Sequence, residues 1–304
     1  EPCAPAPRAP QLEAEPRRYR RSDDGEYEVH TGRLPTSPSL TNCQARPTND
    51  DERWAVETEI HQTAIVEDGA RLGSGVRVGE FSIVRAGASI GAGSRIGSHC
   101  EIGYGSDTFE GELSIGANST IRSHTVIYTA STVGEGFQTG HRAIVRERST
   151  IGAHVRVGSL ADIEGTCEIG NHVRIHSGVF VPAETVIGDY AWLFPYVVIT
   201  NDPYPPSNQL VGVTIEPYAA VGARSVLLPG VTIGRDSLVA AGSVVSRDVA
   251  SGSVVAGVPA RELADAASVQ LGEDGGPAYP WRRQYRTGYP ADAIEAWERE
   301  FPEG

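Results

Sequence analysis

The sequence predicts an all-β protein folded as a parallel β-helix, in which short strands coil into a three-sided prism. Between residues 64 and 261 an aliphatic residue recurs every six positions, and a glycine often follows it directly. A period of six fits neither the 3.6-residue period of an amphipathic helix nor the alternation of an ordinary strand. Three six-residue sides close a coil of about eighteen residues, and successive coils can pair as parallel strands.

The repeat runs in phase except at two points. The repeated position holds Val66, Leu72, Val78, Val84, Ile90, Ile96, Ile102, Ile115, Ile121, Ile127, Val133, Thr139, Val145, Ile151, Val157, Ile163, Ile169, Ile175, Val181, Ile187, Leu193, Ile199, Ile215, Val221, Leu227, Ile233, Val239 and Val245. The frame slips across YGSDTFEGEL and again across TNDPYPPSNQLVGVT. Each hexad is expected to form a strand of about four residues and a two-residue corner, with the aliphatic side chain inward and glycine easing the turn.

The two ends of the chain lack this repeat. Residues 1–58 are rich in Pro, Arg and acidic residues and predict an extended N-terminal arm. The β-helix is expected over residues 59–262 and a tail over 263–304. In the tail, Pro290 is placed to open a helix through Ala291–Phe301. We expect the tail to cap the open end of the coil or to clasp a neighbouring subunit.

Composition excludes several classes of protein. A formal charge of −13 and a pI near 5.1 argue against a protein that coats nucleic acid or an anionic membrane. No apolar run approaches the ~20 residues that span a bilayer. The cysteines are too dispersed for a disulfide framework or a zinc knuckle, and we interpret them as free thiols of a cytoplasmic protein: Cys3, Cys43, Cys100 and Cys167.

The central region resembles a known family. VGARSVLLPGVTIGRDSLVAAGSVVSRDV followed by GVPAR resembles the C-terminal signature of the hexapeptide-repeat acyltransferases. IRSHTVIYTASTVGEGFQTGHRAIVRERSTIG, RIHSGVFVP and VVITNDPYP are similar to segments of its bacterial nucleotide-sugar N-acetyltransferase branch. The resemblance implies a left-handed β-helix, a homotrimer with active sites in grooves between subunits, and coenzyme A along the C-terminal coils.

Candidate catalytic residues follow from the repeat and the resemblance together. His141 lies in the interior hexad that Thr139 opens instead of an aliphatic residue, and the family's Gly-His motif falls on Gly140-His141. Imidazole titrates near neutrality and can act as a general base. We expect Glu147 to orient that imidazole or to contact the acceptor, although a solvated charge is an alternative. Asn201 opens the second insertion and could hold an acceptor amine or polarise a thioester carbonyl.

The resemblance also implies two binding sites. The acceptor is expected to contact His124, Tyr196 and Asp202, although Asp followed by Pro is also ordinary turn chemistry. Coenzyme A is expected along backbone amides of small residues, near arginines that neutralise its phosphates and a proline that flanks its adenine: Gly222, Ala223, Arg224, Ala240, Ala241, Arg247, Pro259 and Arg261.

A metal site is a weaker interpretation. His154 and His172 are eighteen residues apart and should stack in adjacent coils, with Tyr190 continuing the column. The γ-class carbonic anhydrases, a related trimeric family, bind zinc through three histidines, the last two spaced H-x4-H. Here His172 and His176 are spaced H-x3-H. In this fold a change of one residue in the spacing turns a side chain from the groove towards the core or a corner. We therefore expect no metal.

The predicted activity is direct transfer from acetyl-CoA or another acyl-CoA to an amino group of a nucleotide-linked sugar or a similar small molecule. Alternatives are transfer to a hydroxyl of a sugar or natural product, a γ-carbonic-anhydrase-like metalloenzyme, and a non-catalytic β-helix scaffold.

Overall fold

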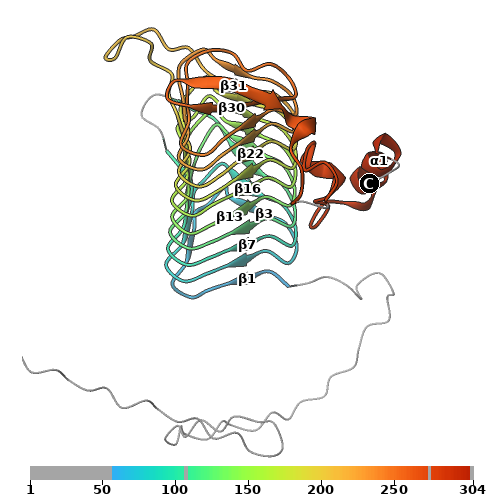
Figure 1. The fold of residues 1–304 in the computed structure, drawn as a ribbon. Coiled ribbons are helices and arrows are strands. Elements are labelled where there is room, and N and C mark those ends of the chain that lie inside the picture. Colours follow the sequence, from blue (N-terminus) through green and yellow to red (C-terminus); the bar gives the residue numbers. More distant parts are fainter. Residues whose placement is uncertain (1–56, 106–108, 273–274, 302–304) are drawn as a thin grey trace, which may run out of the picture. The chain divides into compact units, whose positions relative to one another are not determined.

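A computed structural model describes residues 57–105, 109–272 and 275–301. They form the predicted left-handed parallel β-helix, in which consecutive strands pass to successive faces of a prism (Figure 1). Every strand before β31 pairs in parallel with the strand one coil away, as Gln138 of β13 pairs with Arg156 of β16. The expected N-terminal arm lies outside the described residues, apart from its last two.

Three sheets make the three faces. In spatial order, sheet A comprises β1 (Glu59–Ile60), β4 (Arg77–Val78), β7 (Arg95–Ile96), β10 (Thr120–Ile121), β13 (Gln138–Thr139), β16 (Arg156–Val157), β19 (Arg174–Ile175), β22 (Trp192–Leu193), β25 (Ala220–Val221), β28 (Leu238–Val239), β30 (Ser253–Gly257) and β31 (Ala260–Asp265). Sheet B comprises β2 (Ile65–Val66), β5 (Ile83–Val84), β8 (Glu101–Tyr104), β11 (Val126–Tyr128), β14 (Ile144–Val145), β17 (Asp162–Ile163), β20 (Phe180–Val181), β23 (Val198–Ile199), β26 (Val226–Leu227) and β29 (Val244–Val245). Sheet C comprises β3 (Arg71–Leu72), β6 (Ala88–Ile90), β9 (Leu113–Ile115), β12 (Thr132–Val133), β15 (Thr150–Ile151), β18 (Glu168–Ile169), β21 (Val186–Ile187), β24 (Thr214–Ile215) and β27 (Thr232–Ile233).

Most strands contain two residues, so the expected strand length of four was too long. The backbone turns at each corner through a residue with φ near +60°, such as Arg142 at φ 57°. Coil-to-coil hydrogen bonds nevertheless continue through the corners, where the Leu160 amide donates to the His141 carbonyl at 3.0 Å. The hydrogen-bond ladder is therefore longer than the regular strands.

The predicted aliphatic positions form the core. Those from Val78 onward are buried, whereas Val66 and Leu72 near the N-terminal end are half-buried. Thr139 is fully buried in place of an aliphatic residue, and its hydroxyl accepts a hydrogen bond from the Arg122 amide at 2.9 Å. The exceptional hexad thus keeps its inward side chain and satisfies the polar atom.

The residue before each inward position points outward. These outward residues differ between the three sheets, and so does the chemistry of the three outer faces. In one coil these outward residues are Gln138 of sheet A, Ile144 of sheet B and Thr150 of sheet C. The outer face of sheet B is the apolar one, with Ile65, Ile83, Val126, Ile144, Phe180, Val198, Val226 and Val244. Two acids interrupt this face: Glu101 pairs with Arg85, and burial raises the pKa of Asp162.

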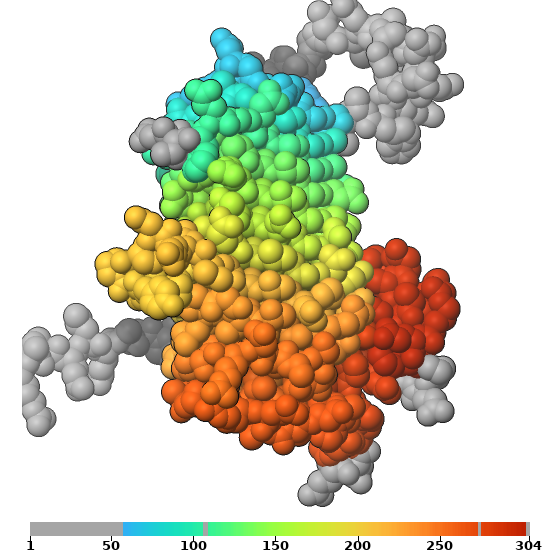
Figure 2. All heavy atoms as spheres, turned by 90° about the horizontal axis from the view of Figure 1, so that it is seen from above, coloured from blue at the N-terminus to red at the C-terminus, as the bar shows by residue number. Residues whose placement is uncertain are grey.

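Both insertions leave the same edge of the prism, where sheet B passes to sheet C. One lies between β8 and β9, and the other between β23 and β24. The second insertion and the C-terminal tail project from opposite sides of the coil (Figure 2). No helix among the described residues is long and apolar enough to cross a membrane.

The tail contains the predicted helix, α1 (Ala291–Glu300), after two 3-10 turns, η2 (Ala266–Ser268) and η3 (Trp281–Arg283). It packs on the side of the coil, and the antiparallel hairpin of β30 and β31 follows the last coil at the open end (Figure 1). From Trp281 onward the tail therefore lies along the side of the coil and not over its open end, and the alternative that it clasps a neighbouring subunit stays a prediction. Trp281 and Trp297 are buried against outward aromatic residues of sheet A and its neighbouring corners, which hold the tail to the side.

Candidate active site

Most of the predicted site residues lie along one edge, where sheet A turns into sheet B. This AB edge includes residues 122–125, 140–143, 158–161, 176–179, 194–197, 222–225 and 240–243. It carries His124, His141, Tyr196, Gly222, Ala223, Arg224, Ala240 and Ala241. Pro259 and Arg261 lie at the hairpin of β30 and β31, where the Gly257 amide donates to Ser243 of the edge at 3.3 Å.

His141 is exposed on the AB edge, in a column of small polar residues. Its Nδ1 lies 2.7 Å from Oγ of Ser123 in the preceding coil. Its own amide donates to Oγ of Ser159 in the following coil at 3.0 Å. If Nδ1 carries the proton and donates to Ser123, Nε2 keeps a free lone pair directed away from the column. This arrangement suits a general base, and the two serines were not identified from the sequence.

The same column continues into the C-terminal coils with Ala223 and Ala241. Ala223 lies four coils beyond His141, which is about 19 Å at the ~4.8 Å spacing of paired strands. Neighbouring Gly222 has no room for a side chain, because a Cβ there would lie 2.5 Å from the Ala241 amide nitrogen. Gly222 is therefore required by close contact between adjacent coils, and the small side chains of Ala223 and Ala241 leave this part of the edge free of bulky groups.

Exposed rings flank this column in the next position of several corners. His99 and His124 stack with ring centroids 4.9 Å apart. Tyr196 is 55% exposed, and its ring lies over Gly178, where a Cβ would come within 2.6 Å of it. The structure thus places His124 and Tyr196 beside the His141 column, as substrate contacts on this edge require.

The remaining predicted residues lie on the BC edge, where sheet B turns into sheet C: Glu147, Asn201, Asp202 and Arg247. Glu147 is 4% exposed and pairs with Arg146 at 3.0 Å. Because β14 separates it from His141, the two do not meet within one chain. The expectation that Glu147 orients His141 is therefore not supported inside a single chain, whereas its role as an acceptor contact stays a prediction.

Asn201 and Asp202 organise the second insertion. Nδ2 of Asn201 donates to the Ala183 carbonyl at 3.0 Å. The Asp202 carboxylate accepts hydrogen bonds from the amide and hydroxyl of Ser207 and from the Tyr204 amide. The Ser207 hydroxyl bond, with the two amide bonds, lowers the pKa of Asp202. Its carboxylate therefore stays charged and holds the loop in shape.

This loop overhangs a hollow of about 570 Å³ on the outer face of sheet B. Asn201 and Asp202 line it together with the apolar side chains of Phe180 and Val198. The AB and BC edges thus flank the apolar face of sheet B, one carrying the candidate base and the other this hollow.

The histidines expected to stack do so. The rings of His154 and His172 lie 5.0 Å apart, and those of His172 and Tyr190 lie 4.8 Å apart. His176 lies on the AB edge and stacks on Phe194 instead. Among the described residues, no three His, Cys, Asp or Glu side chains gather in a way that could hold a metal ion.

Two cysteines are described, and both are free and buried. Burial raises the pKa of the Cys100 thiol, and it raises that of Cys167 to about 12. A thiol with a raised pKa is a poor nucleophile near neutral pH. Neither cysteine suits a covalent acyl-enzyme.

The repeat of this chain matches the model of a known protein family. The family described as bacterial transferase hexapeptide (six repeats) matches residues 69–104, 148–183 and 212–247. A similar curated protein is the 2,3,4,5-tetrahydropyridine-2,6-dicarboxylate N-acetyltransferase of Staphylococcus aureus, 46% identical over 66 residues. That stretch is 22% of this chain and 27% of the relative, so the chain spans about a quarter of the length of the curated relatives it matches.

Similar solved structures include an Arabidopsis UDP-N-acetylglucosamine acyltransferase, 19% identical, with a TM-score of 0.44 and coverage of 80% of this chain and 83% of that one. Another is a hexapeptide-repeat acetyltransferase of Vibrio cholerae complexed with acetyl coenzyme A. It is 26% identical, with a TM-score of 0.32 and coverage of 43% of this chain and 71% of that one.

Proposed function

We propose that this chain, whose repeat matches the bacterial transferase hexapeptide family over residues 69–104, 148–183 and 212–247, is an acyl-CoA-dependent acyltransferase that acylates an amine of a small molecule. The observation that carries the proposal is the exposed His141, held through Nδ1 by Ser123 on the same edge as the small residues Gly222, Ala223 and Ala241. The N-acetyltransferase named among the similar proteins supports an acetyl donor and an amine acceptor.

In this proposal the donor lies along the AB edge. Its pantetheine arm follows the backbone at Gly222 and Ala241, where small residues allow close approach. Arg224 and Arg261 are exposed near this path and can neutralise the phosphates of coenzyme A. Arg247 lies on the BC edge and could reach the same donor only from a neighbouring subunit.

The reaction needs one proton transfer in each direction. Nε2 of His141 removes a proton from the acceptor amine, and the nitrogen attacks the thioester carbonyl carbon. Backbone N–H groups of the edge stabilise the tetrahedral oxyanion. The C–S bond then breaks, the amide forms, and the departing thiolate takes the proton from His141. No enzyme side chain is acylated.

A homotrimer would complete this site. If the apolar sheet B faces pack around a threefold axis, the AB edge of one subunit lies beside the BC edge of the next. His141 of one chain would then share a groove with the Asn201 loop of its neighbour. The apolar outer face of sheet B supports this arrangement, because a single chain leaves Ile65 and Val198 substantially exposed.

The acceptor class rests on the sequence resemblance. We propose an amino group on a nucleotide-linked sugar, and a sugar or natural-product hydroxyl is the alternative. Thiol release measured over a matrix of acyl-CoA donors and amino-sugar or sugar acceptors would separate the two. Failure to bind any acyl-CoA would instead favour a non-catalytic scaffold.

Replacing His141 with Ala tests the mechanism. Loss of a general base should lower kcat about 10²–10⁴-fold, with the donor still bound. The control is His61→Ala, because His61 lies at the first AB corner, away from the proposed donor path, and among the described residues its side chain hydrogen-bonds only to Thr63. If the His141 variant kept turnover within a few fold of the parent, the assignment of the base would be wrong.

A further inference from the structure

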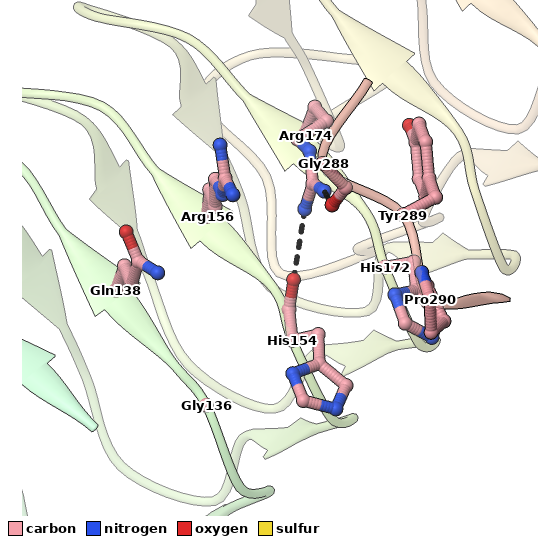
Figure 3. Close-up of a pocket in the computed structure, with 9 residues that line it drawn as sticks. All are labelled: Gly136, Gln138, His154, Arg156, His172, Arg174, Gly288, Tyr289 and Pro290. Carbon is pink, nitrogen blue, oxygen red and sulfur yellow. Dashed lines mark hydrogen bonds between the residues drawn. The ribbon is translucent and has the colours of Figure 1, made fainter. Parts of the chain in front are cut away.

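A second hollow, of about 230 Å³, lies on the opposite side of sheet A from the AB edge. It adjoins the CA edge, where sheet C turns into sheet A, and includes residues 152–155 and 170–173. Arg156 and Arg174 of sheet A and His172 of the CA edge line it, and residues 288–290 of the tail form another wall (Figure 3).

The two arginines lie side by side without a counter-charge. Arg156 and Arg174 are paired residues of adjacent strands. Arg174 is 7% exposed and donates to the carbonyls of His154 at 2.8 Å and Gly288 at 3.4 Å. Its guanidinium also lies 4.9 Å from the Tyr289 ring. Within the described part of the chain, no carboxylate pairs with either arginine, and burial together with Arg156 lowers the pKa of Arg174.

Another buried arginine under the same tail is treated differently. Arg282 is 1% exposed, and it forms ion pairs with Asp236 and, at 2.6 Å, with Glu300. A buried cation is costly unless anions or strong acceptors surround it. The tail interface therefore supplies two carboxylates to Arg282 and none to Arg174. A hollow lies beside Arg174 instead.

His172 gives an independent indication of a ligand. It is 9% exposed, and its Nδ1 is buried without a hydrogen-bond partner. Buried polar atoms are nearly always bonded, so an orphan beside a hollow indicates a missing partner. The carboxylate of Glu135 comes within 3.7 Å of His154 but pairs with neither arginine.

We propose that this hollow is a binding site for a compact oxyanion with at least two negative charges, such as a phosphate monoester or a dicarboxylate. Planar guanidinium groups on adjacent strands suit several oxygens at once. The volume is below that of ordinary ligand pockets, which fits a small anion or one anionic group of a larger molecule. Because the tail forms part of the wall, binding also holds the tail against the coil.

Titration calorimetry on the full chain without acyl-CoA tests the site, with inorganic phosphate and malonate as probes and acetate as the monoanion comparison. Phosphate or malonate should bind the parent more tightly than acetate. Arg156→Gln should weaken binding about tenfold or more, and its exposed side chain makes a folding defect unexpected. The matched control is Arg95→Gln, because Arg95 has the same outward position in sheet A but does not line this hollow.

A second measurement follows the tail. Phosphate should slow hydrogen exchange of residues 281–300 in the parent and have much less effect in Arg174→Gln. Absence of binding by both dianions, or equal binding in the parent and both variants, would overturn the proposal. His141→Ala should bind phosphate like the parent, so failure of the acyltransferase mechanism and failure of this site are separate results.

Discussion

The AB and CA edges are built from the same type of corner. The AB edge is open, whereas the tail covers the CA edge. On the CA edge, the stack of His154 and His172 continues through Tyr190 to Tyr218, with the two tyrosine rings 5.0 Å apart. The tail packs over that stack, and Nε1 of Trp281 donates to the Tyr218 carbonyl at 3.0 Å. On the AB edge, nothing in the described part of the chain covers His141 in this way.

This difference shows that the six-residue repeat by itself does not determine whether an edge is covered or open to a ligand. Most corners contain a residue with positive φ, and where these residues are aromatic in adjacent coils their rings stack, on both edges. On the CA edge, a segment of the same chain covers the column and leaves a hollow lined by Arg156, Arg174 and His172. On the AB edge, the column stays available to a ligand or a neighbouring subunit.

The largest effect is expected from Ile144→Arg, which puts a charge on the apolar face beside the AB edge. If sheet B forms the subunit interface, the trimer should dissociate to monomers, measured by light scattering after size-exclusion chromatography. Thr150→Arg, on the polar face of the same coil, should leave the mass unchanged. An Ile144 variant with the mass of the parent would show that the AB and BC edges do not meet through this face.

Trp297→Ala should uncover the CA edge. Trp297 is 2% exposed, and truncation of a buried Trp costs about 3–5 kcal/mol. That loss should detach the tail and speed hydrogen exchange of residues 281–300, while exchange in the coil core stays slow. Tyr285→Ala, at the exposed rim, should have a smaller effect. Equal acceleration in the two variants, or no change in either, would contradict the role of the tail as a cover.

Gly140→Ala should disturb the AB edge from within. A Cβ at Gly140 would lie 2.2 Å from the Ser159 amide nitrogen, so the backbone must shift. Overpacking of this kind costs about 1–3 kcal/mol, and it should also disturb the Ser159 bond to His141. Urea unfolding measures the loss. The control is Gly105→Ala, because a Cβ at Gly105 would have no atom within 4 Å and should leave stability nearly unchanged. A similar loss of stability in both variants would show that close contact between coils is not the cause.

The smallest effect concerns pH. Burial, with His154 and Arg174, lowers the pKa of His172 below its ordinary value of 6.5. The unfolded chain then binds more protons between the two pKa values. Stability is therefore full above pH 6.5 and falls as the pH drops through the lowered folded pKa. His172→Gln should flatten the decline of Tm between pH 7.5 and 5, although His176, whose pKa is also lowered, keeps part of it. An unchanged slope would contradict this.

Much of the site could be predicted because the repeat fixes the place of each residue. A spacing of eighteen residues predicts the stack of His154 on His172, which the structure confirms. The partners of His141 were missed, although Ser123 and Ser159 lie eighteen residues on either side of it. The separation of Glu147 from His141 was missed as well, because six residues that are close in sequence span a whole side of the prism.

The sequence by itself predicted the β-helix, its inward residues and the two insertions, because a six-residue period fits neither an amphipathic helix nor an ordinary strand. It also predicted the C-terminal helix, because Pro290 marks the start of that helix. Only the tertiary structure decided that the tail packs along the side and that Arg174 is buried with no carboxylate partner among the described residues. These features depend on contacts between residues a hundred or more apart, such as Gly288 with Arg174. Such contacts are not written in a local pattern.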